Sequence, residues 1–443
     1  MNHEPRSRLR PRLLSRFKTR LPHLALPVKK TPPNVPRVSS RVSAAAPLDS
    51  IEGAHHDPTL FALLSVSAGL IAANLYYNQP LLAGMADSFG VSPRAVGGIP
   101  TLTQLGYGLG MLLVVPLGDR FERSRLIVGM TSVASIALVG VALAPSLFWL
   151  TLGSLVLGFA SMAPQLIVPY AAGVGPAARR GRAVGTVMSG LLVGILLSRA
   201  LSGVVGGHFG WRAMYGLAAG IMAVLALVLR ARLPAQSPEN PVPVTTVYSS
   251  LGNVVRTQPV LRLHAVIGAL TFGAFSIFWS TLSFHLAAPP HRLGSEVVGL
   301  FSIVGVAGAL AAPMVGRFAD RHDPRLINAA AMVTVILSFA AFGFFGNSLL
   351  GIAVGVLLLD IGVQANQISN QARIFSLDPN LRNRINTVYM ATYFAGGAAG
   401  SWLGSYAWTH ARWTGVSLAG GALGVAAVLI FALVTILGRR AAR

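Results

Sequence analysis

The chain contains no cysteine, and this absence excludes disulfide bonds and metal sites built on thiolates. Charged residues are also scarce: they make up 11% of the 443 residues, whereas a soluble domain carries about a quarter. Acidic residues are rarer than basic ones, with 13 Asp and Glu against 35 Lys and Arg. A chain with so few charges that is 53% hydrophobic is too apolar for a soluble domain and is typical of a membrane protein.

Long apolar runs recur along the sequence, separated by short polar segments. Each run has about twenty residues, the length at which an α-helix crosses the hydrocarbon core of a bilayer. The two-residue alternation of membrane β-strands is absent, so helices are the expected spanning elements. The sequence predicts an all-α membrane protein with twelve transmembrane helices, at 59–83, 95–116, 126–144, 147–171, 184–206, 212–232, 261–286, 296–316, 326–345, 347–372, 385–407 and 415–437.

Two polar segments divide this pattern. Residues 1–57 are rich in arginine and then in proline, too polar to bury a core, and we expect a disordered basic cytoplasmic tail. An over-extended reading frame and a targeting signal are the alternatives. Residues 233–260 contain five prolines and predict a cytoplasmic linker. The expected domains are therefore an N-terminal six-helix bundle at 58–232 and a C-terminal six-helix bundle at 261–443.

The arginines indicate the orientation in the membrane. Most of those between the predicted spans fall on one side, and only four fall on the other: Arg94, Arg212, Arg292 and Arg412. By the positive-inside rule the arginine-rich side is cytoplasmic, and an even number of spans places both termini there. Basic clusters beside apolar runs also account for the net charge of +22 without a nucleic-acid partner.

The two halves of the chain repeat one another. A shift of about two hundred residues aligns uncommon residue types in corresponding spans and loops, including Gln165 with Gln367, Trp211 with Trp413, and Asp119-Arg120 with Asp320-Arg321. Such a repeat predicts two six-helix units that run in the same sense, as in transporters built from two parallel bundles.

Several motifs resemble one family of membrane proteins. The loop Leu117-x-Asp119-Arg120-x-x-Arg123 has an echo from Gly316 to Arg325, the first span reads N-L-Y-Y-N-Q-P from Asn74 to Pro80, and the fifth span is rich in glycine. Together these motifs resemble the major facilitator superfamily, and are most similar to bacterial twelve-span drug or sugar efflux proteins of the proton-antiporter type. The resemblance implies alternating access by two bundles, with a substrate held between them, in a bacterial inner membrane.

In the resembling family the charged loop latches the two halves in the outward-facing state. The resemblance therefore implies a gating role for six residues: Asp119, Arg120, Arg123, Asp320, Arg321 and Arg325. Charges that only set the topology are the alternative. The match is incomplete, because Val115 and Glu122 stand where the family usually has glycine.

The tenth span carries a polar stripe. Asp360, Gln364, Gln367 and Gln371 recur at i, i+4, i+7 and i+11, so they share one helix face. Polar side chains are costly in lipid, so this face must meet protein or a water-filled cavity. Asp360 is the acid that lies deep within a predicted span, where a carboxyl group can take up and release a proton. We expect it to couple transport to protons; a structural acid hydrogen-bonded between helices is the alternative.

The resemblance places the first, fourth, seventh and tenth spans around the substrate. The amide and aromatic side chains on these spans can hydrogen-bond or stack against a solute. They give the expected substrate-binding set of Asn74, Tyr77, Asn78, Gln165, Trp279, Gln364, Gln367 and Gln371. For Trp279, plain aromatic packing is an equal alternative.

The fifth span contains small residues that allow close helix packing, among them Gly190, Gly194 and Gly203. Arg199 lies between them, where the resembling antiporters have a proline. A lone arginine in a span needs a partner. Its partner could be Asp360 or an anionic group of the substrate. The sequence favours an ion pair with a structural role, or an Arg199 side chain that extends to the membrane surface.

These observations predict proton-coupled efflux of a small amphipathic or sugar-like solute. The alternatives are uptake by proton symport or uniport, and a non-transporting receptor. The coupling mode is open because many proton antiporters have an arginine in span four, and Met162 stands at that position here. No nucleophile-base pair, metal-ligand spacing or phosphate loop occurs in the sequence, so neither catalysis nor a metal or cofactor is expected. The expected partners are a small-molecule substrate, protons and membrane lipid, and the expected state is a monomer.

Overall fold

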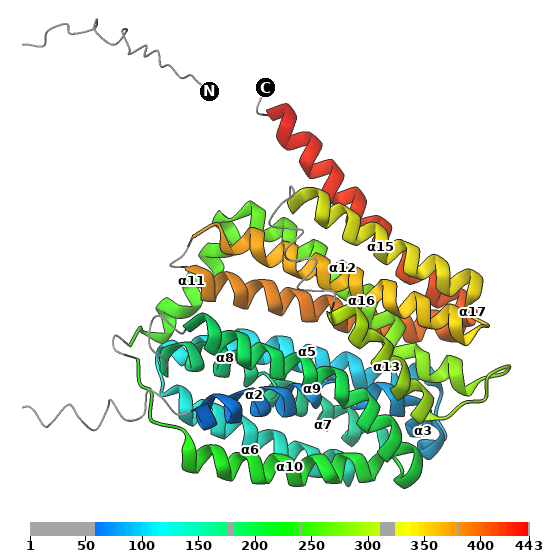
Figure 1. The fold of residues 1–443 in the computed structure, drawn as a ribbon, viewed down its shortest axis with the longest axis horizontal. Helices are drawn as coiled ribbons and strands as arrows, with labels where there is room; N and C mark the ends of the chain where they lie inside the picture. The colour runs from blue at the N-terminus through cyan, green and yellow to red at the C-terminus, as the bar shows by residue number, and fades with distance from the viewer. Residues whose placement is uncertain (1–57, 175–179, 239–240, 311–323, 379–380, 442–443) are drawn as a thin grey trace, which may run out of the picture. The chain divides into compact units, whose positions relative to one another are not determined.

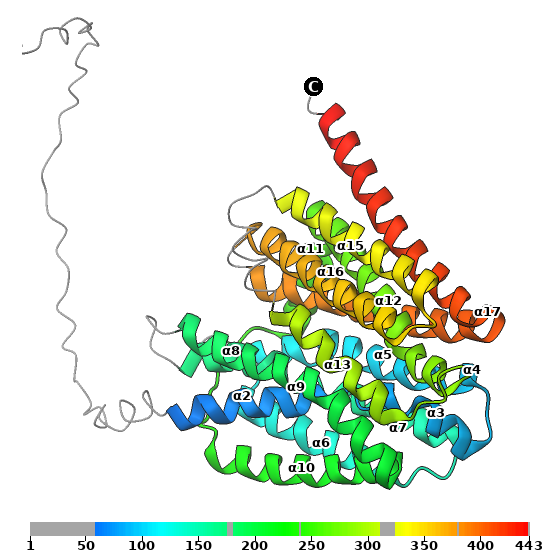
Figure 2. The same ribbon diagram turned by 45° about the vertical axis from the view of Figure 1, so that its right-hand side comes forward.

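The computed structural model describes residues 58–174, 180–238, 241–310, 324–378 and 381–441, so the predicted tail lies outside the described residues. Every regular element in these ranges is a helix (Figures 1 and 2). Ten helical segments are long and apolar enough to cross a membrane. The last of them, Arg382–Leu437, contains two predicted spans that meet where Ala411 and Arg412 leave helical geometry. With this segment divided and the shorter α13 (Ser295–Leu310) included, all twelve predicted helices are present.

The first half of the chain forms six of these helices, three of them in pieces. In order they are α2 (Pro58–Ala73) with α3 (Asn78–Phe89); α4 (Pro93–Val96), α5 (Gly98–Leu113) and η2 (Val115–Asp119); α6 (Arg123–Ala142); α7 (Leu147–Ala160) with α8 (Pro164–Val174); α9 (Arg180–Phe209); and α10 (Trp211–Arg232). The second half forms α12 (Pro259–Ala287), α13, α15 (Pro324–Phe345), α16 (Leu349–Phe375) and α17 (Arg382–Ala441).

Prolines interrupt the first and fourth spans. Proline has no N–H, and its ring crowds the carbonyl group four residues earlier. Pro80 therefore disturbs the helix at Tyr76, and the chain between Ala73 and Asn78 forms turns instead. Pro164 has the same effect at Ala160, after which three residues in turns precede α8. Both breaks interrupt the regular helix in the middle of a span, among buried residues.

Glycines bring α9 close to its neighbours. A Cβ atom at Gly190 would collide with the backbone of Ser65 in α2, and one at Gly203 would collide with the Ser295 carbonyl of α13. Gly194 meets the backbone of α2 in the same way. Helix α9 therefore packs tightly on α2 from its own half of the sequence and on α13 from the other half (Figure 2).

The segment predicted as a linker contains a helix that the sequence analysis missed, α11 (Val244–Thr257). Its buried side chains, Val247, Leu251 and Val254, recur at helical spacing and form one apolar face. The segment is also fastened to the loop around η2, because the Tyr248 hydroxyl donates to the Leu113 carbonyl at 2.6 Å. The backbone N–H of Arg123 donates to the Gln236 carbonyl at 3.2 Å.

Candidate functional site

The break in the first span places unpaired amides in the interior. Asn74 is fully buried, and neither its Oδ1 nor its Nδ2 atom has a hydrogen-bond partner. Asn78 is also buried; its Nδ2 atom donates to the Leu75 carbonyl and the Thr103 hydroxyl, while Oδ1 has no partner. Tyr77 is buried, and its backbone carbonyl accepts a hydrogen bond from Ser202. Buried polar atoms are normally hydrogen-bonded, so these exceptions mark a candidate binding region.

Arg199 lies in the interior beside this break, with 2% of its surface exposed. Its Nε atom donates to Gln79 Oε1 at 2.5 Å. The guanidinium carbon lies 4.5 Å from the centre of the Tyr76 ring and 4.3 Å from that of Trp279, within the range of cation–π attraction. The prediction that Arg199 extends to the membrane surface is therefore wrong, because a hydrogen bond and two aromatic rings hold it inside.

Asp360 of α16 is also buried, with 8% of its surface exposed. Its Oδ2 atom accepts no hydrogen bond, and the carboxylate packs against Gly305 of α13, which leaves room for it. Within the described ranges, no ion pair shorter than 4 Å joins Asp360 to Arg199, yet the two opposite charges are close enough to interact electrostatically. The structure thus places the two buried charges near one another without direct contact.

The predicted glutamines lie at the partly exposed edge of this region. Gln364, Gln367 and Gln371 are half-buried on α16. The hydroxyl of Tyr393 donates to Gln367 Oε1 at 3.4 Å, and Gln371 Nε2 lies 3.9 Å from the Met390 sulfur. These contacts show that Gln367 and Gln371 face α17 rather than the first span.

Gln165 of α8 is likewise half-buried, and its Nε2 atom donates to the Tyr107 hydroxyl at 3.1 Å. The Tyr107 ring in turn packs on Phe394 of α17, with ring centres 4.2 Å apart. Trp279 is fully buried, and its Nε1 atom has no hydrogen-bond partner. The structure therefore brings Trp279 to Arg199, while the hydrogen bond of Gln165 connects it through Tyr107 to Phe394 in the second half of the chain.

Gln104 of α5 is a polar residue that the sequence analysis missed. It is buried, its Nε2 atom donates to the Ser401 hydroxyl at 3.0 Å, and its Oε1 atom accepts from Ser276 at 3.2 Å. These bonds join α5 to α17 and α12, which come from the other half of the sequence. An amide within an apolar span was the available signal.

A closed ring of three asparagines was also missed. Asn328 donates to Asn370 at 2.8 Å, Asn370 donates to Asn366 at 2.9 Å, and Asn366 donates to Asn328 at 2.5 Å. Thr271 donates to Asn366 Oδ1 at 2.8 Å, and His264 Nδ1 lies 2.7 Å from Asn370 Oδ1. The ring ties α12, α15 and α16 together with satisfied amides, so it stabilises the helix that carries Asp360.

In the part of the chain that the structure describes, no cluster of His, Asp and Glu could hold a metal ion.

The sequence profile of the Major Facilitator Superfamily matches residues 64–401. The chain belongs to the major facilitator superfamily. It is 41% identical over 374 residues to the putative uncharacterized transporter YgaY of Escherichia coli strain K12, across 84% of this chain and 95% of that protein. It is 25% identical to a probable sugar efflux transporter of Helicobacter acinonychis, across 84% of this chain and 94% of that protein.

Solved structures of other transporters share the fold. The nucleoside transporter NupG superposes with a TM-score of 0.69 at 15% identity, across 84% of this chain and 98% of that one. A bacterial homologue of the human lysosomal transporter Spinster, in an inward-facing and occupied conformation, gives 0.70 at 15% identity, across 86% and 96%. The predicted family and the all-helical membrane fold are confirmed: the chain is a multi-pass transporter of small molecules and not an enzyme.

The charged loop at residues 117–123 is described, but its echo at residues 316–325 is described only from residue 324 onward. Arg123 Nη2 lies 3.5 Å from Asp119 Oδ1, and Arg120 is exposed. Glu122, which replaces an expected glycine, pairs with Arg125 at 2.6 Å and accepts a hydrogen bond from Ser124, so it fixes the start of α6. Arg325 is exposed at the start of α15; two further predicted gating residues lie outside the described residues, namely Asp320 and Arg321.

Proposed function

We propose that this transporter exports a small amphipathic or sugar-like solute across a bacterial inner membrane in exchange for protons. The observation that carries the proposal is a set of buried, unpaired polar atoms in the break of the first span, on Arg199 and its neighbour Trp279, and on Asp360: Asn74 Oδ1 and Nδ2, Asn78 Oδ1, Arg199 Nη2, Trp279 Nε1 and Asp360 Oδ2. Each unpaired buried atom costs about 1–3 kcal/mol, and a solute with hydroxyl or carbonyl groups would recover that cost by bonding to it.

The composition of this region suits an amphipathic solute. Amide, guanidinium and carboxyl groups offer both donors and acceptors, and the faces of Tyr77 and Trp279 offer apolar contact. The half-buried amides of Gln165, Gln364, Gln367 and Gln371 extend the set toward the exposed edge. Residues from both halves would thereby contact one solute, as alternating access requires.

Asp360 is the proposed proton-coupling residue. A negative charge buried without a hydrogen bond on Oδ2 is costly, and protonation removes it. When Asp360 is charged, it attracts Arg199, which belongs to the other half of the sequence; when it is neutral, that attraction is lost. Proton uptake and release would therefore change the interaction between α9 and α16 as well as the contacts offered to the solute.

We further propose that the η2 loop is part of a cytoplasmic gate, formed by Asp119, Arg120, Arg123, Asp320, Arg321 and Arg325. The contacts that support it are the Asp119–Arg123 pair and the hydrogen bonds that attach residues 233–260 to Leu113 and Arg123. By the positive-inside rule we place both termini in the cytoplasm. We also propose that the transporter works as a monomer.

Efflux is favoured by the similarity to two Helicobacter proteins that are described as probable sugar efflux transporters. One observation favours proton symport of an anionic solute as the second candidate. Among the described residues no carboxylate pairs with Arg199, and its Nη2 atom has no partner, so it could bind a solute anion while Asp360 holds a proton. If binding of a proton to Asp360 strengthened binding of the anion to Arg199, both would cross the membrane in the same direction, which is symport rather than exchange.

The experiment that tests the proposal compares a strain that overexpresses the gene with a deletion strain. Everted and right-side-out membrane vesicles from both are given a panel of labelled sugars, sugar acids and amphipathic drugs, with and without an imposed pH gradient. Proton-coupled efflux predicts accumulation of a neutral or amphipathic solute that a protonophore abolishes. Accumulation of only anionic solutes, in right-side-out vesicles, would contradict efflux and support the second candidate.

A further inference from the structure

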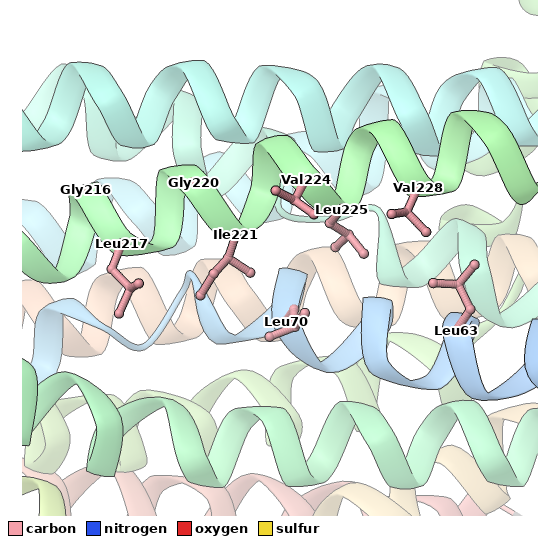
Figure 3. Close-up of a pocket in the computed structure, with 9 residues that line it drawn as sticks. All are labelled: Leu63, Leu70, Gly216, Leu217, Gly220, Ile221, Val224, Leu225 and Val228. Atoms are coloured by element: carbon pink, nitrogen blue, oxygen red, sulfur yellow. The ribbon is translucent and has the colours of Figure 1, made fainter.

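An apolar groove lies where α10 faces α2 (Figure 3). Its volume is about 660 Å³, and its lining residues are all apolar: Leu63, Leu70, Gly216, Leu217, Gly220, Ile221, Val224, Leu225 and Val228. Gly216 and Gly220 create the recess, since no atom lies within 4 Å of the position that a Cβ atom would take at either glycine. In Figure 3, Ile221 and Leu225 point from α10 toward α2, the helix that carries Leu70.

The length of the groove matches one leaflet of a membrane. Leu217 and Val228 are eleven residues apart on α10, which at 1.5 Å per residue corresponds to about 16 Å. The hydrocarbon core of a bilayer is about 30 Å thick, so the groove spans about half of it. An acyl chain of one leaflet fits this length, whereas a neighbouring transmembrane helix would contact α10 over the full thickness.

A basic residue follows the groove at one end. Arg232 comes one helical turn after Val228 and lies on the same face of α10. It is exposed and makes no hydrogen bond or ion pair with the residues that the structure describes. An arginine at the end of a span can reach the lipid headgroups, and its guanidinium group suits a phosphate. Arg230, two residues earlier, is also exposed but lies on the opposite face.

We propose that this groove binds an anionic phospholipid, with one acyl chain between α10 and α2 and its phosphate on Arg232. The apolar lining, the one-leaflet length and the free cation in line with it together define the ligand chemistry. The site is independent of the solute and of the coupling ion, because none of its residues belongs to the candidate transport site. It therefore stands or fails separately from the proposed function.

Native mass spectrometry of the delipidated full-length protein tests the proposal. Phosphatidylglycerol and phosphatidylcholine with identical chains are titrated separately, and bound lipid is counted. We expect Arg232→Ala to weaken phosphatidylglycerol binding about fivefold, the worth of one arginine near anionic lipid. Phosphatidylcholine binding should weaken less, because the choline cation of that lipid offsets the charge of its phosphate. Arg230→Ala is the matched control and should change neither.

A second variant tests the acyl-chain part of the site. Gly220→Leu fills the recess and should weaken binding of both lipids about tenfold or more. Gly140→Leu, at an exposed glycine of α6 with open space around it, is its control. Unchanged binding in Gly220→Leu, or equal affinity of the wild type for the two lipids, would overturn the proposal. A wild-type dimer that Gly220→Leu converts to a monomer would also overturn it, because the groove would then join two copies of the chain.

Discussion

The guanidinium group of Arg199 lies against the ring of Trp279, with its central carbon 4.3 Å from the ring centre. Arg199 belongs to α9 and Trp279 to α12, so this contact joins the two halves of the chain beside Asp360. A buried cation at such a position fixes both the charge of the site and the contact between the halves. The predictions below separate these roles.

Arg199→Lys should lower both thermal stability and transport, although the charge is kept. Lysine lacks the planar group that stacks between Tyr76 and Trp279, and it cannot reproduce the Nε bond to Gln79 in the same geometry. We expect a loss of about 1–3 kcal/mol, seen as a lower melting temperature of the purified protein. Arg182→Lys, at an exposed position on the same helix, should have no effect. Equal stability of both variants would contradict the assigned contacts.

Asn74→Leu should make the protein more stable and a poorer transporter. Leucine has nearly the same size, and it removes two buried polar atoms that have no hydrogen-bond partner in the protein. The measurements are the melting temperature and the KM for the solute found in the vesicle screen. If Asn74→Leu lowers the melting temperature instead, Asn74 has a structural role and does not bind solute.

Asn366→Leu should have the opposite effect on stability. Its amide nitrogen donates to Asn328, and its oxygen accepts from Asn370 and Thr271, so its loss leaves these three side chains each without one hydrogen bond. We expect a destabilisation of about 2–5 kcal/mol. The same thermal assay detects it, and Asn253→Leu, on the surface of α11, is the control. A melting temperature within a degree of the wild type would show that the ring does not stabilise the second half.

The double variant Gly108→Cys/Phe394→Cys should arrest transport reversibly. A Cβ atom at Gly108 would lie 3.7 Å from the Cβ of Phe394, a separation that suits a disulfide between α5 and α17. The chain has no other cysteine, so the cross-link can be assigned without ambiguity. Oxidation should stop flux and dithiothreitol should restore it, while each single variant responds to neither. Full flux in the cross-linked protein would contradict relative motion of the two halves at this contact.

The spans could be predicted because apolar length is a local property. The tenth was expected at 347–372 and occurs at Leu349–Phe375, and its three-to-four-residue spacing identified the face that carries Asp360. The position of Arg199 could not be predicted in this way, because it depends on Tyr76 and Trp279 from distant spans. The asparagine ring likewise requires three helices to meet. Helix α11 was missed because its apolar face is only three residues long within a proline-rich segment.

The central claim is that a proton on Asp360 drives transport. Its most direct test is Asp360→Asn in proteoliposomes, which permanently mimics the protonated, neutral side chain. We expect the variant to lose solute accumulation driven by a pH gradient but to retain exchange of labelled for unlabelled solute. Asp87→Asn, at an exposed acid of α3, should behave like the wild type. Proton-driven accumulation that persists unchanged in Asp360→Asn would contradict the account.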